Sequence, residues 1–393
     1  MQLLEGLRVV EVALLAPNQL GMHLADLGAD VVKVEEPGQG DYTRNVGRTR
    51  LAGVSMLHVR WNRGKRSIAL DLRRPEGAAV FRELVAQSEV VIEGLRAGAL
   101  ERRGLGYREL AEVNPALVFA SLSGFGQTGP YRDLATHGVA YDAYAGLAAP
   151  AVTEDGFPAI PAGYCDIGTQ AGALYATAGV LAAVLNARAT GRGTWLDVAQ
   201  ADAAVAWNAS RIDPRRVGAE AEAGSDLSAS VRYQYYATAD GRHILFQASE
   251  RHFFERFCRG VSREDLLGTG NTAEHGEHAR GDVGLRRELA AIFATRTQSE
   301  WVAFFLEHDV PGGPVHAPAD LVDDPQFQAR FGASPRNAPD ASGMLGTPVH
   351  TGEPAAPIRP APGLGQHTDE VLRELLGYDG ARVVALRAAG VVA

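Results

Sequence analysis

The sequence lacks several features that would restrict its class. Its 393 residues include only two cysteines, Cys165 and Cys258, which is too few for a disulfide framework or a four-cysteine zinc site. We therefore expect a reducing, cytoplasmic location. No run of about 18 uncharged apolar residues occurs, so no membrane-spanning helix is expected. The first eight residues show no basic segment before an apolar core, so we expect no secretory signal.

Clustered positive charge is missing as well. Lysine and arginine total 38 against 47 acidic residues, a net charge of −9. Without a basic stripe, nucleic acid is a poor candidate partner. Only two basic residues are lysines, Lys33 and Lys65, a scarcity that we interpret as codon bias. Apolar residues make up 46% of the chain, which indicates a globular protein and excludes disorder as its dominant state.

What the sequence does contain is an alternation of short apolar runs and helical patterns. Apolar runs at 7–12 and 29–34 flank a helical spacing over 19–27, which predicts strand, helix, strand. The alternation continues as helix, strand, helix, strand over residues 76–87, 90–93, 107–113 and 117–121. This order is typical of an α/β fold with a parallel sheet and helices on its faces.

The second half of the chain changes character. A long apolar helix is predicted over 172–189 and a strand over 195–198, followed by a linker, a hairpin with an Asp240-Gly241 turn, and several helices. We predict a large domain that begins with residues 1–217, a linker and small α+β domain over 218–330, and a linker with a returning C-terminal segment over 331–393. The helices of the later part are predicted at 251–259, 284–296, 298–308 and 368–376.

Several catalytic motifs are absent. The chain has no G-x-G-x-x-G after its first strand, no P-loop and no G-x-S-x-G elbow, so nucleotide hydrolysis and serine-hydrolase chemistry lack support. Histidines are scattered. His275 and His278 lie three apart in a glycine-rich and glutamate-rich segment, which is more typical of a solvated loop than of a metal site. We therefore expect no metal centre.

A few polar residues have both a structural and a functional interpretation. Asp166 precedes the long helix, where it could cap the helix or place a carboxylate beside backbone N–H groups that stabilise developing negative charge. His137, beyond a Gly/Pro-rich loop, is by default structural, and Glu250 is by default a first-turn charge. The basic turn around Arg63 and Lys65 is either solvated or a phosphate site.

Longer motifs resemble the class III, CaiB/BaiF-type, CoA-transferases. The resemblance covers nearly the whole chain and appears in the expected order. It is carried by Ala25–Glu35, Asn62–Leu72, Leu105–Tyr107, Asn114-Pro115, Ser123–Pro130, Asp166–Thr169, Thr190–Gly193 and Gly365–Glu370. It implies an interlocked homodimer in which each chain has a large Rossmann-like domain and a small domain.

The resemblance also implies a coenzyme A site. The family's CoA contacts fall on Leu70, Asp71, Leu72 and Arg73, on Gly94, Leu95 and Arg96, and on Arg102. Three departures stand out. The family usually has Asn-Phe-Arg/Lys-Pro where this chain begins with Gly94, several members carry an arginine near Glu36 that this chain lacks, and Gln170–Gly172 reads as an extra turn after Asp166.

The family's catalytic aspartate falls on Asp166. The resemblance implies that its carboxylate attacks an acyl-CoA thioester and that CoA is then carried as an aspartyl-CoA thioester to an acceptor carboxylic acid. CoA is then part of the substrate, and neither a metal nor a permanently bound cofactor is required. The expected partners are an acyl-CoA, a carboxylic acid and a second copy of the chain.

A second branch of the family, the α-methylacyl-CoA racemases, offers an alternative. Its catalytic His, Asp and Glu fall on His137, Asp166 and Glu250, and would exchange an α-proton. The residue sequences of Ser121–Pro130 and Val310–Val315 are more similar to those of the transferases, so we expect a transferase. A different acyl-CoA reaction, or a non-catalytic acyl-CoA binder, is a third interpretation.

Overall fold

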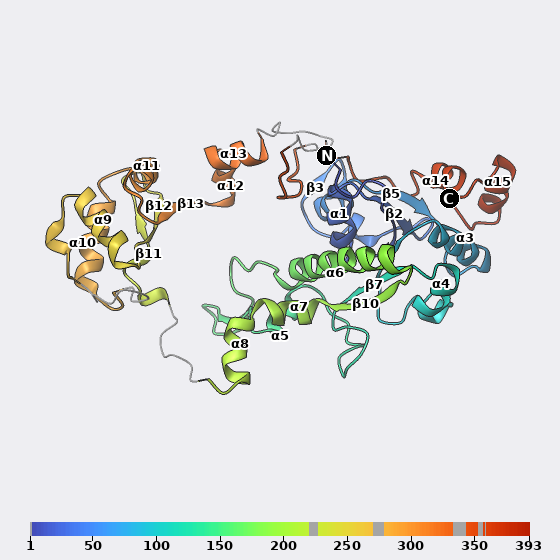
Figure 1. Ribbon diagram of the computed structural model, residues 1–393, viewed down its shortest axis with the longest axis horizontal. Helices are drawn as coiled ribbons and strands as arrows, with labels where there is room; N and C mark the ends of the chain where they lie inside the picture. The colour runs from blue at the N-terminus through green and yellow to red at the C-terminus, as the bar shows by residue number, and fades with distance from the viewer. Residues whose placement is uncertain (1, 220–226, 270–278, 333–342, 353–356, 358) are drawn as a thin grey trace. The chain divides into compact units, whose positions relative to one another are not determined.

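The computed structural model describes residues 2–219, 227–269, 279–332, 343–352, 357 and 359–393 (Figure 1). The chain forms two compact units. One comprises Met1–Ala219 together with Ser334–Ala393, and the other comprises Glu220–Ala333. His275 and His278 lie outside the described residues.

A six-stranded parallel sheet organises the first unit. The strand order is β10-β7-β6-β1-β2-β5, so the order reverses between β1 and β6. The strands are β1 (Arg8–Ala13), β2 (Asp30–Glu35), β5 (Arg66–Ala69), β6 (Val90–Gly94), β7 (Val118–Ser123) and β10 (Thr194–Ala199). The α/β prediction with a parallel sheet is confirmed, and all of these strands except β5 were predicted.

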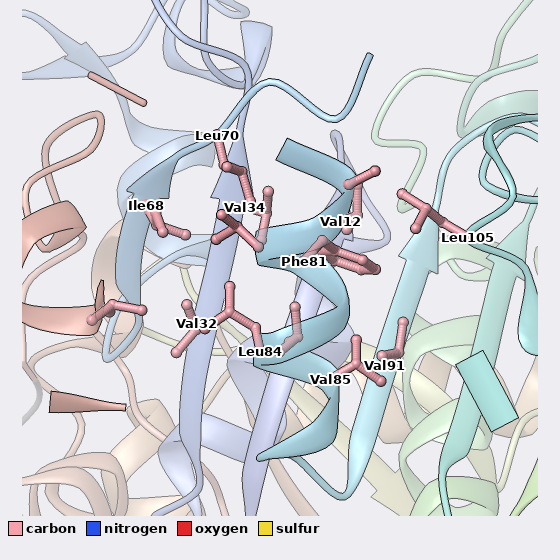
Figure 2. Packing of buried hydrophobic residues seen from close by; sticks show 14 of the residues in the cluster. Val12, Val32, Val34, Ile68, Leu70, Phe81, Leu84, Val85, Val91 and Leu105 are labelled. Atoms are coloured by element: carbon pink, nitrogen blue, oxygen red, sulfur yellow. The ribbon is translucent and has the colours of Figure 1, made fainter. Parts of the chain in front are cut away.

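Both faces of the sheet are buried, as the alternation of side chains along a strand requires. Figure 2 shows one face, where α3 (Pro75–Ala86) lays Phe81 and Leu84 on Val32 and Val34. Val9 and Val31 point the other way, into a core shared with α1 (Asn18–Asp26). The four inner strands β1, β2, β6 and β7 therefore each contribute to two separate hydrophobic clusters.

Helix α6 (Gly168–Thr190) belongs to the second of these clusters through Ala176, Val180 and Val184. It begins four residues earlier than the sequence pattern predicted and runs unbroken through Gln170–Gly172. Its length and apolar composition would suffice to cross a membrane, but 56% of its most apolar stretch is buried inside the protein. It ends at Gly191, which has a positive φ of 69°, as left-handed helix caps require.

The C-terminal segment covers the sheet edge at β5. Leu70 forms an antiparallel bridge with Val392, and the Ala393 N–H donates to the Ala69 carbonyl at 3.3 Å. The predicted last helix is α14 (Thr368–Glu374), and a further helix, α15 (Gly380–Ala388), was not predicted. Edge strands of this kind are open to unwanted pairing, and here the chain's own end fills the position.

The second unit has a three-stranded antiparallel sheet, β11-β12-β13. The predicted hairpin is confirmed as β11 (Tyr233–Ala237) and β12 (His243–Gln247), and β13 (Gly312–Val315) completes the sheet. Helices α9 (Arg251–Gly260), α10 (Val283–Phe293) and α11 (Gln298–His308) match the predicted ranges to within three residues. Their core is aromatic: Phe246, Phe257, Phe293 and Trp301 are all fully buried.

The remaining elements are short. They are β3 (Arg50–Leu51), β4 (Val54–Ser55), α2 (Met56–Trp61), α4 (Tyr107–Val113), α5 (Val139–Tyr144), β8 (Ala151–Val152), β9 (Pro158–Ala159), α7 (Gln200–Trp207), α8 (Ala209–Arg216), α12 (Pro318–Leu321) and α13 (Pro325–Phe331).

The buried His58 predicts acid sensitivity. Burial, together with the positive charges of Arg44 and Lys33, lowers the pKa of His58 from 6.5 to about 4. Because the unfolded chain takes up this proton first, stability is complete above pH 6.5 and is lost as the pH falls toward 4. Each pH unit in this window removes at most about 1.4 kcal/mol. Urea unfolding at pH 7 and pH 5 measures the loss.

His58→Gln should flatten part of this pH dependence. The remainder comes from His23 and His367, whose pKa values are also lowered by burial. His243→Gln, which replaces an exposed histidine, is the matched control and should leave the profile unchanged. Identical slopes for the wild type and His58→Gln would contradict the assignment.

Candidate active site

The loops that leave β1 and β6 meet at the point where the strand order reverses, which is where doubly wound sheets bind their ligands. Gly94 ends β6 against the loop after β1. A Cβ added to Gly94 would lie 2.4 Å from Pro17 Cβ and 2.7 Å from Ala13 Cβ. No side chain fits there, which gives a physical reason for glycine at the position where the resembling family usually has asparagine.

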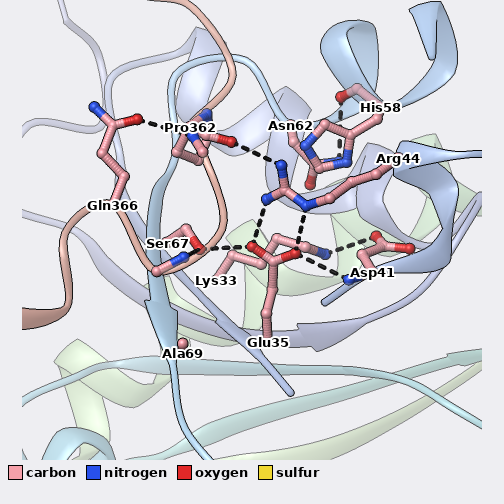
Figure 3. A network of polar contacts seen from close by, with 12 residues as sticks. Lys33, Glu35, Asp41, Arg44, His58, Asn62, Ser67, Ala69, Pro362 and Gln366 are labelled. Atoms are coloured by element: carbon pink, nitrogen blue, oxygen red, sulfur yellow. Dashed lines mark hydrogen bonds and ion pairs between the residues drawn. The ribbon is translucent and has the colours of Figure 1, made fainter. Parts of the chain in front are cut away.

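A cluster of fully buried charges holds the loop after β1. Lys33 donates from Nζ to the Ala13 carbonyl at 2.8 Å and to Asn18 Oδ1 at 2.6 Å, and it pairs with Asp41 at 3.0 Å. Figure 3 shows Lys33 and Asp41 beside a second pair, Glu35 with Arg44. Burial disfavours the lysine charge, but Asp41 and Glu11 more than offset this and raise the pKa of Lys33.

Lys65 joins the same cluster from the other side. Its Nζ donates to Glu11 Oε2 at 2.6 Å and to the Asn18 carbonyl at 2.8 Å. Burial lowers its pKa to about 8, while Glu11 opposes the shift. Nearby, buried Arg63 pairs with Asp26. Both expectations for the basic turn were therefore wrong, because these cations are neither solvated nor free to bind phosphate.

The residues predicted to contact CoA lie at the carboxyl edge of the sheet. Leu70, Asp71, Leu72 and Arg73 follow β5, whereas Gly94, Leu95 and Arg96 lie where β6 ends. Three strand spacings, about 14 Å, separate these two strands. Arg102 lies in the short 3-10 helix Glu101–Arg103, on the continuation of the β6 loop.

Tertiary structure supplies the arginine that the sequence lacks near Glu36. Exposed Arg73 pairs with Glu36, with 2.6 Å between Nη2 and Oε1, and its Nε also contacts Asp71 at 2.9 Å. Leu70 itself is buried, and its N–H donates to the Glu35 carbonyl at 2.8 Å, so neither its side chain nor its N–H is open to a ligand in the single chain.

Asp166 lies two residues before α6 and is half-buried. Its Oδ1 accepts from the Thr169 N–H at 3.3 Å and its Oδ2 accepts from Thr169 Oγ1 at 2.6 Å. Burial raises the pKa of Asp166, an effect that these hydrogen bonds oppose and the nearby Asp142 charge reinforces. Asp166 thus caps the first turn of the helix and at the same time presents a partly desolvated carboxylate.

A second carboxylate, Asp142, was missed by the sequence analysis. It is fully buried in α5, where its Oδ1 accepts from the Gly168 N–H at 2.7 Å and its Oδ2 accepts from the Ile167 N–H at 3.0 Å and from the Tyr164 hydroxyl. Burial and this bond raise the pKa of Tyr164. No motif singles out Asp142, because its partners lie more than 20 residues away.

These two aspartates affect the role that the sequence analysis suggested for the helix start, which was to stabilise developing negative charge. The N–H groups of Ile167, Gly168 and Thr169 all donate to carboxylates. They are therefore not free to stabilise an oxyanion, as the sequence had suggested.

His137 is exposed. Its neighbour Gly138 faces Asp166: a Cβ added there would lie 3.1 Å from Asp166 Oδ2. Glu250 belongs to the second unit, where it precedes α9 and accepts from Ser249 Oγ at 3.1 Å. The structure therefore brings the segment of His137 to Asp166, and it places Glu250 in a separate unit. Among the described residues, no group of three or more His, Cys, Asp or Glu side chains has the arrangement of a metal site.

Comparison with known proteins places this chain in a family. Residues 4–368 match CoA-transferase family III, and the chain belongs to that family. It is 32% identical to succinyl-CoA--D-citramalate CoA-transferase of Chloroflexus aurantiacus, covering 99% of this chain and 98% of that protein. It is 31% identical to human succinyl-CoA:glutarate CoA-transferase, covering 99% of this chain and 90% of that one.

Solved structures agree with this assignment. A CaiB/BaiF family protein from Brucella suis superposes with a TM-score of 0.74 at 30% identity, covering 94% of this chain and 98% of the other. A Mycobacterium tuberculosis protein superposes with a TM-score of 0.77 at 26% identity, over 94% and 99% of the two chains. The protein is a class III CoA-transferase, as the sequence analysis expected.

Asp142→Ala tests the role of the missed carboxylate. It leaves two N–H groups and a hydroxyl without their acceptor, so we expect a loss of about 2–4 kcal/mol in the free energy of unfolding. Transfer should also slow, because the segment that carries Asp166 loses its anchor. Thermal unfolding and steady-state transfer rates measure the two effects. Asp155→Ala, which removes an exposed carboxylate of the same unit, should change neither, and an unaltered transfer rate in Asp142→Ala would refute the anchoring role.

Proposed function

We propose that this CoA-transferase uses Asp166 as its covalent nucleophile and moves CoA between two dicarboxylic acids. The observation that carries the proposal is the position of Asp166: a half-buried carboxylate fixed at the start of α6 and facing Gly138. A glycine leaves the approach to the carboxylate open, so a thioester carbonyl can reach it.

The proposed reaction needs no reactant besides the acyl-CoA, the acceptor acid and Asp166. The Asp166 carboxylate attacks the thioester carbonyl, which forms a mixed anhydride and releases the CoA thiolate. The thiolate attacks the aspartyl carbonyl, which frees the donor acid and leaves an aspartyl-CoA thioester. The acceptor carboxylate then displaces the thiolate from the aspartyl carbonyl. Attack of the thiolate on the acyl carbonyl of the new anhydride yields the new acyl-CoA and restores Asp166.

Each attack creates an oxyanion that needs hydrogen-bond donors. The N–H groups of Ile167, Gly168 and Thr169 are occupied, whereas the N–H groups of Gly138 and Val139 donate no hydrogen bond within the described chain. Gly138 also lies beside the Asp166 carboxylate. We therefore assign this segment, at the start of α5, as the source of the oxyanion donors.

The dicarboxylate substrate class rests on the relatives. The names of the transferases compared above pair succinyl-CoA with D-citramalate or glutarate, and a protein of Agrobacterium fabrum that is 34% identical is named succinate--glutarate CoA-transferase. We propose succinyl-CoA as a donor and a second short dicarboxylic acid as the acceptor. Mass spectrometry after incubation with glutarate, malate or citramalate identifies the acceptor.

Asp166→Ala should abolish transfer and leave the protein folded, because losing a cap costs only about 1 kcal/mol. Hydroxylamine added during turnover should trap an adduct on Asp166 in the wild type, which peptide mass spectrometry locates. His137→Ala should retain much of the transfer rate. Transfer that survives in Asp166→Ala, or an adduct on another residue, would overturn the proposal.

We also propose that the chain forms a homodimer. Several large apolar side chains of α6, α7 and the segment after α8 are open to solvent in the single chain: Leu174, Tyr175, Leu185, Trp207 and Val217, with Leu185 70% and Val217 78% exposed. Monomeric proteins seldom expose so many large apolar side chains on neighbouring elements. A second copy of the chain would cover them.

Light scattering at micromolar concentration should report twice the 41.7 kDa mass of the chain. Leu185→Glu should weaken the association, because a buried carboxylate without a partner is strongly unfavourable in an apolar interface. Arg192→Glu, a charge change in the exposed turn after α6, serves as the control. A wild-type mass of about 42 kDa at these concentrations would contradict the dimer.

A further inference from the structure

Two arginines from different loops converge beside the loop that follows β6. A Cβ added to Gly98 would lie 2.9 Å from Arg132 Nη2 and 3.1 Å from Arg102 Nη1. Arg102 reaches this point from Glu101–Arg103, whereas Arg132 comes from the loop after β7. No sequence motif connects the two arginines, since 30 positions separate them.

Neither guanidinium is neutralised by the protein. Among the described residues, the Arg102 guanidinium donates only to the Ala97 carbonyl, at 3.1 Å, and neither arginine forms an ion pair. The Nε of Arg132 is buried and has no hydrogen-bond partner. Glu101 Oε2 lies 3.5 Å from the same point beside Gly98 but pairs with neither arginine. Two like charges held together with a buried, unused donor form an arrangement that an anion stabilises.

Hydrogen bonds join the two loops that carry these arginines. Gln127 Oε1, on the β7 loop, accepts from the Gly98 N–H at 3.1 Å, which fastens that loop to the β6 loop. The Gln127 N–H in turn donates to Asp197 of β10 at 3.0 Å. Aromatic contacts fix the next turn, where Phe125 packs against Tyr131 with 5.6 Å between ring centroids.

The β6 loop has an anchor of its own. Buried Glu93 accepts from the Leu100 N–H at 2.9 Å and from Ser121 Oγ at 3.2 Å. The bonds from the Gly98 N–H to Gln127 and from the Leu100 N–H to Glu93 therefore fix the backbone beside which both guanidinium groups lie.

We propose that Arg102 and Arg132 bind one phosphate of coenzyme A between them, with Arg132 as a further binding residue that the family resemblance does not supply. The inference rests on the proposed transferase chemistry and on placing CoA along the β6 loop, where the family resemblance puts Gly94, Leu95, Arg96 and Arg102. Planar guanidinium groups match phosphate oxygens in pairs, and CoA offers both a diphosphate and a 3′-phosphate.

Calorimetric titration with CoA and with 3′-dephospho-CoA tests the proposal. Arg132→Ala should weaken CoA binding by about tenfold or more, as expected for loss of a charge-assisted hydrogen bond. Arg132→Lys should recover part of the loss, and Arg192→Ala, at the opposite end of the sheet, should have no effect. If the loss appears with CoA alone, the 3′-phosphate is the ligand. If it appears with both compounds, the diphosphate is the ligand.

The double variant Arg102→Ala/Arg132→Ala shows whether the two groups share one phosphate. Sharing predicts a combined loss that differs from the product of the two single losses, whereas independent sites give the product. Unchanged CoA affinity in Arg132→Ala, or strictly multiplicative losses, would overturn the inference. If Arg102→Ala also binds CoA normally, the proposed placement of CoA fails, while adduct formation at Asp166 still tests the transfer chemistry separately.

Discussion

The buried charge cluster beneath the loop after β1 is the constraint on which the site depends. Two ammonium groups, Lys33 and Lys65, hold this loop through its backbone carbonyls and Asn18, and the carboxylates of Glu11 and Asp41 balance them without solvent. A buried charge that loses its partner costs several kcal/mol. A change in the geometry between β1 and β6 would therefore also destabilise the fold. Because the loop after β1 is held in place, Gly94 can pack against it at van der Waals distance.

The N–H groups at the start of α6 are a second feature that shapes the site. A helix start offers free N–H groups that an enzyme can use for anion binding, but here two aspartates occupy them. Asp142 anchors the backbone from α5, and Asp166 accepts from Thr169 while its raised pKa reports partial desolvation. The carboxylate that we propose as the nucleophile thus lies on a fixed backbone, and the N–H groups of Gly138 and Val139, proposed as oxyanion donors, donate no hydrogen bond within the described chain. Capping and catalysis, which the sequence offered as alternatives for Asp166, are compatible at one residue.

The fold was largely predictable because its signals are local. Strand and helix periodicity identified β1, α1, β2, α3, β6, α4 and β7 almost to the residue, since each needs one or two apolar faces that recur at fixed spacing. Strand β5 was missed because it spans only four residues within a polar motif, and α15 was missed because it follows the last motif that the sequence offered. The start of α6 was placed late because its first turn, with Thr169 and Gln170, is polar.

The sequence by itself determined the fold class, the family and the candidacy of Asp166, because these rest on residue types in order along the chain. Only the tertiary structure decided which charged side chains form ion pairs within the protein and which are left to bind a ligand. The two lysines, whose scarcity was attributed to codon bias, both form ion pairs inside the fold, whereas Arg102 and Arg132, beside Gly98, form no ion pair among the described residues. The physical reason is that ion pairing depends on distance in space, and partners such as Lys65 and Glu11 lie far apart in the chain.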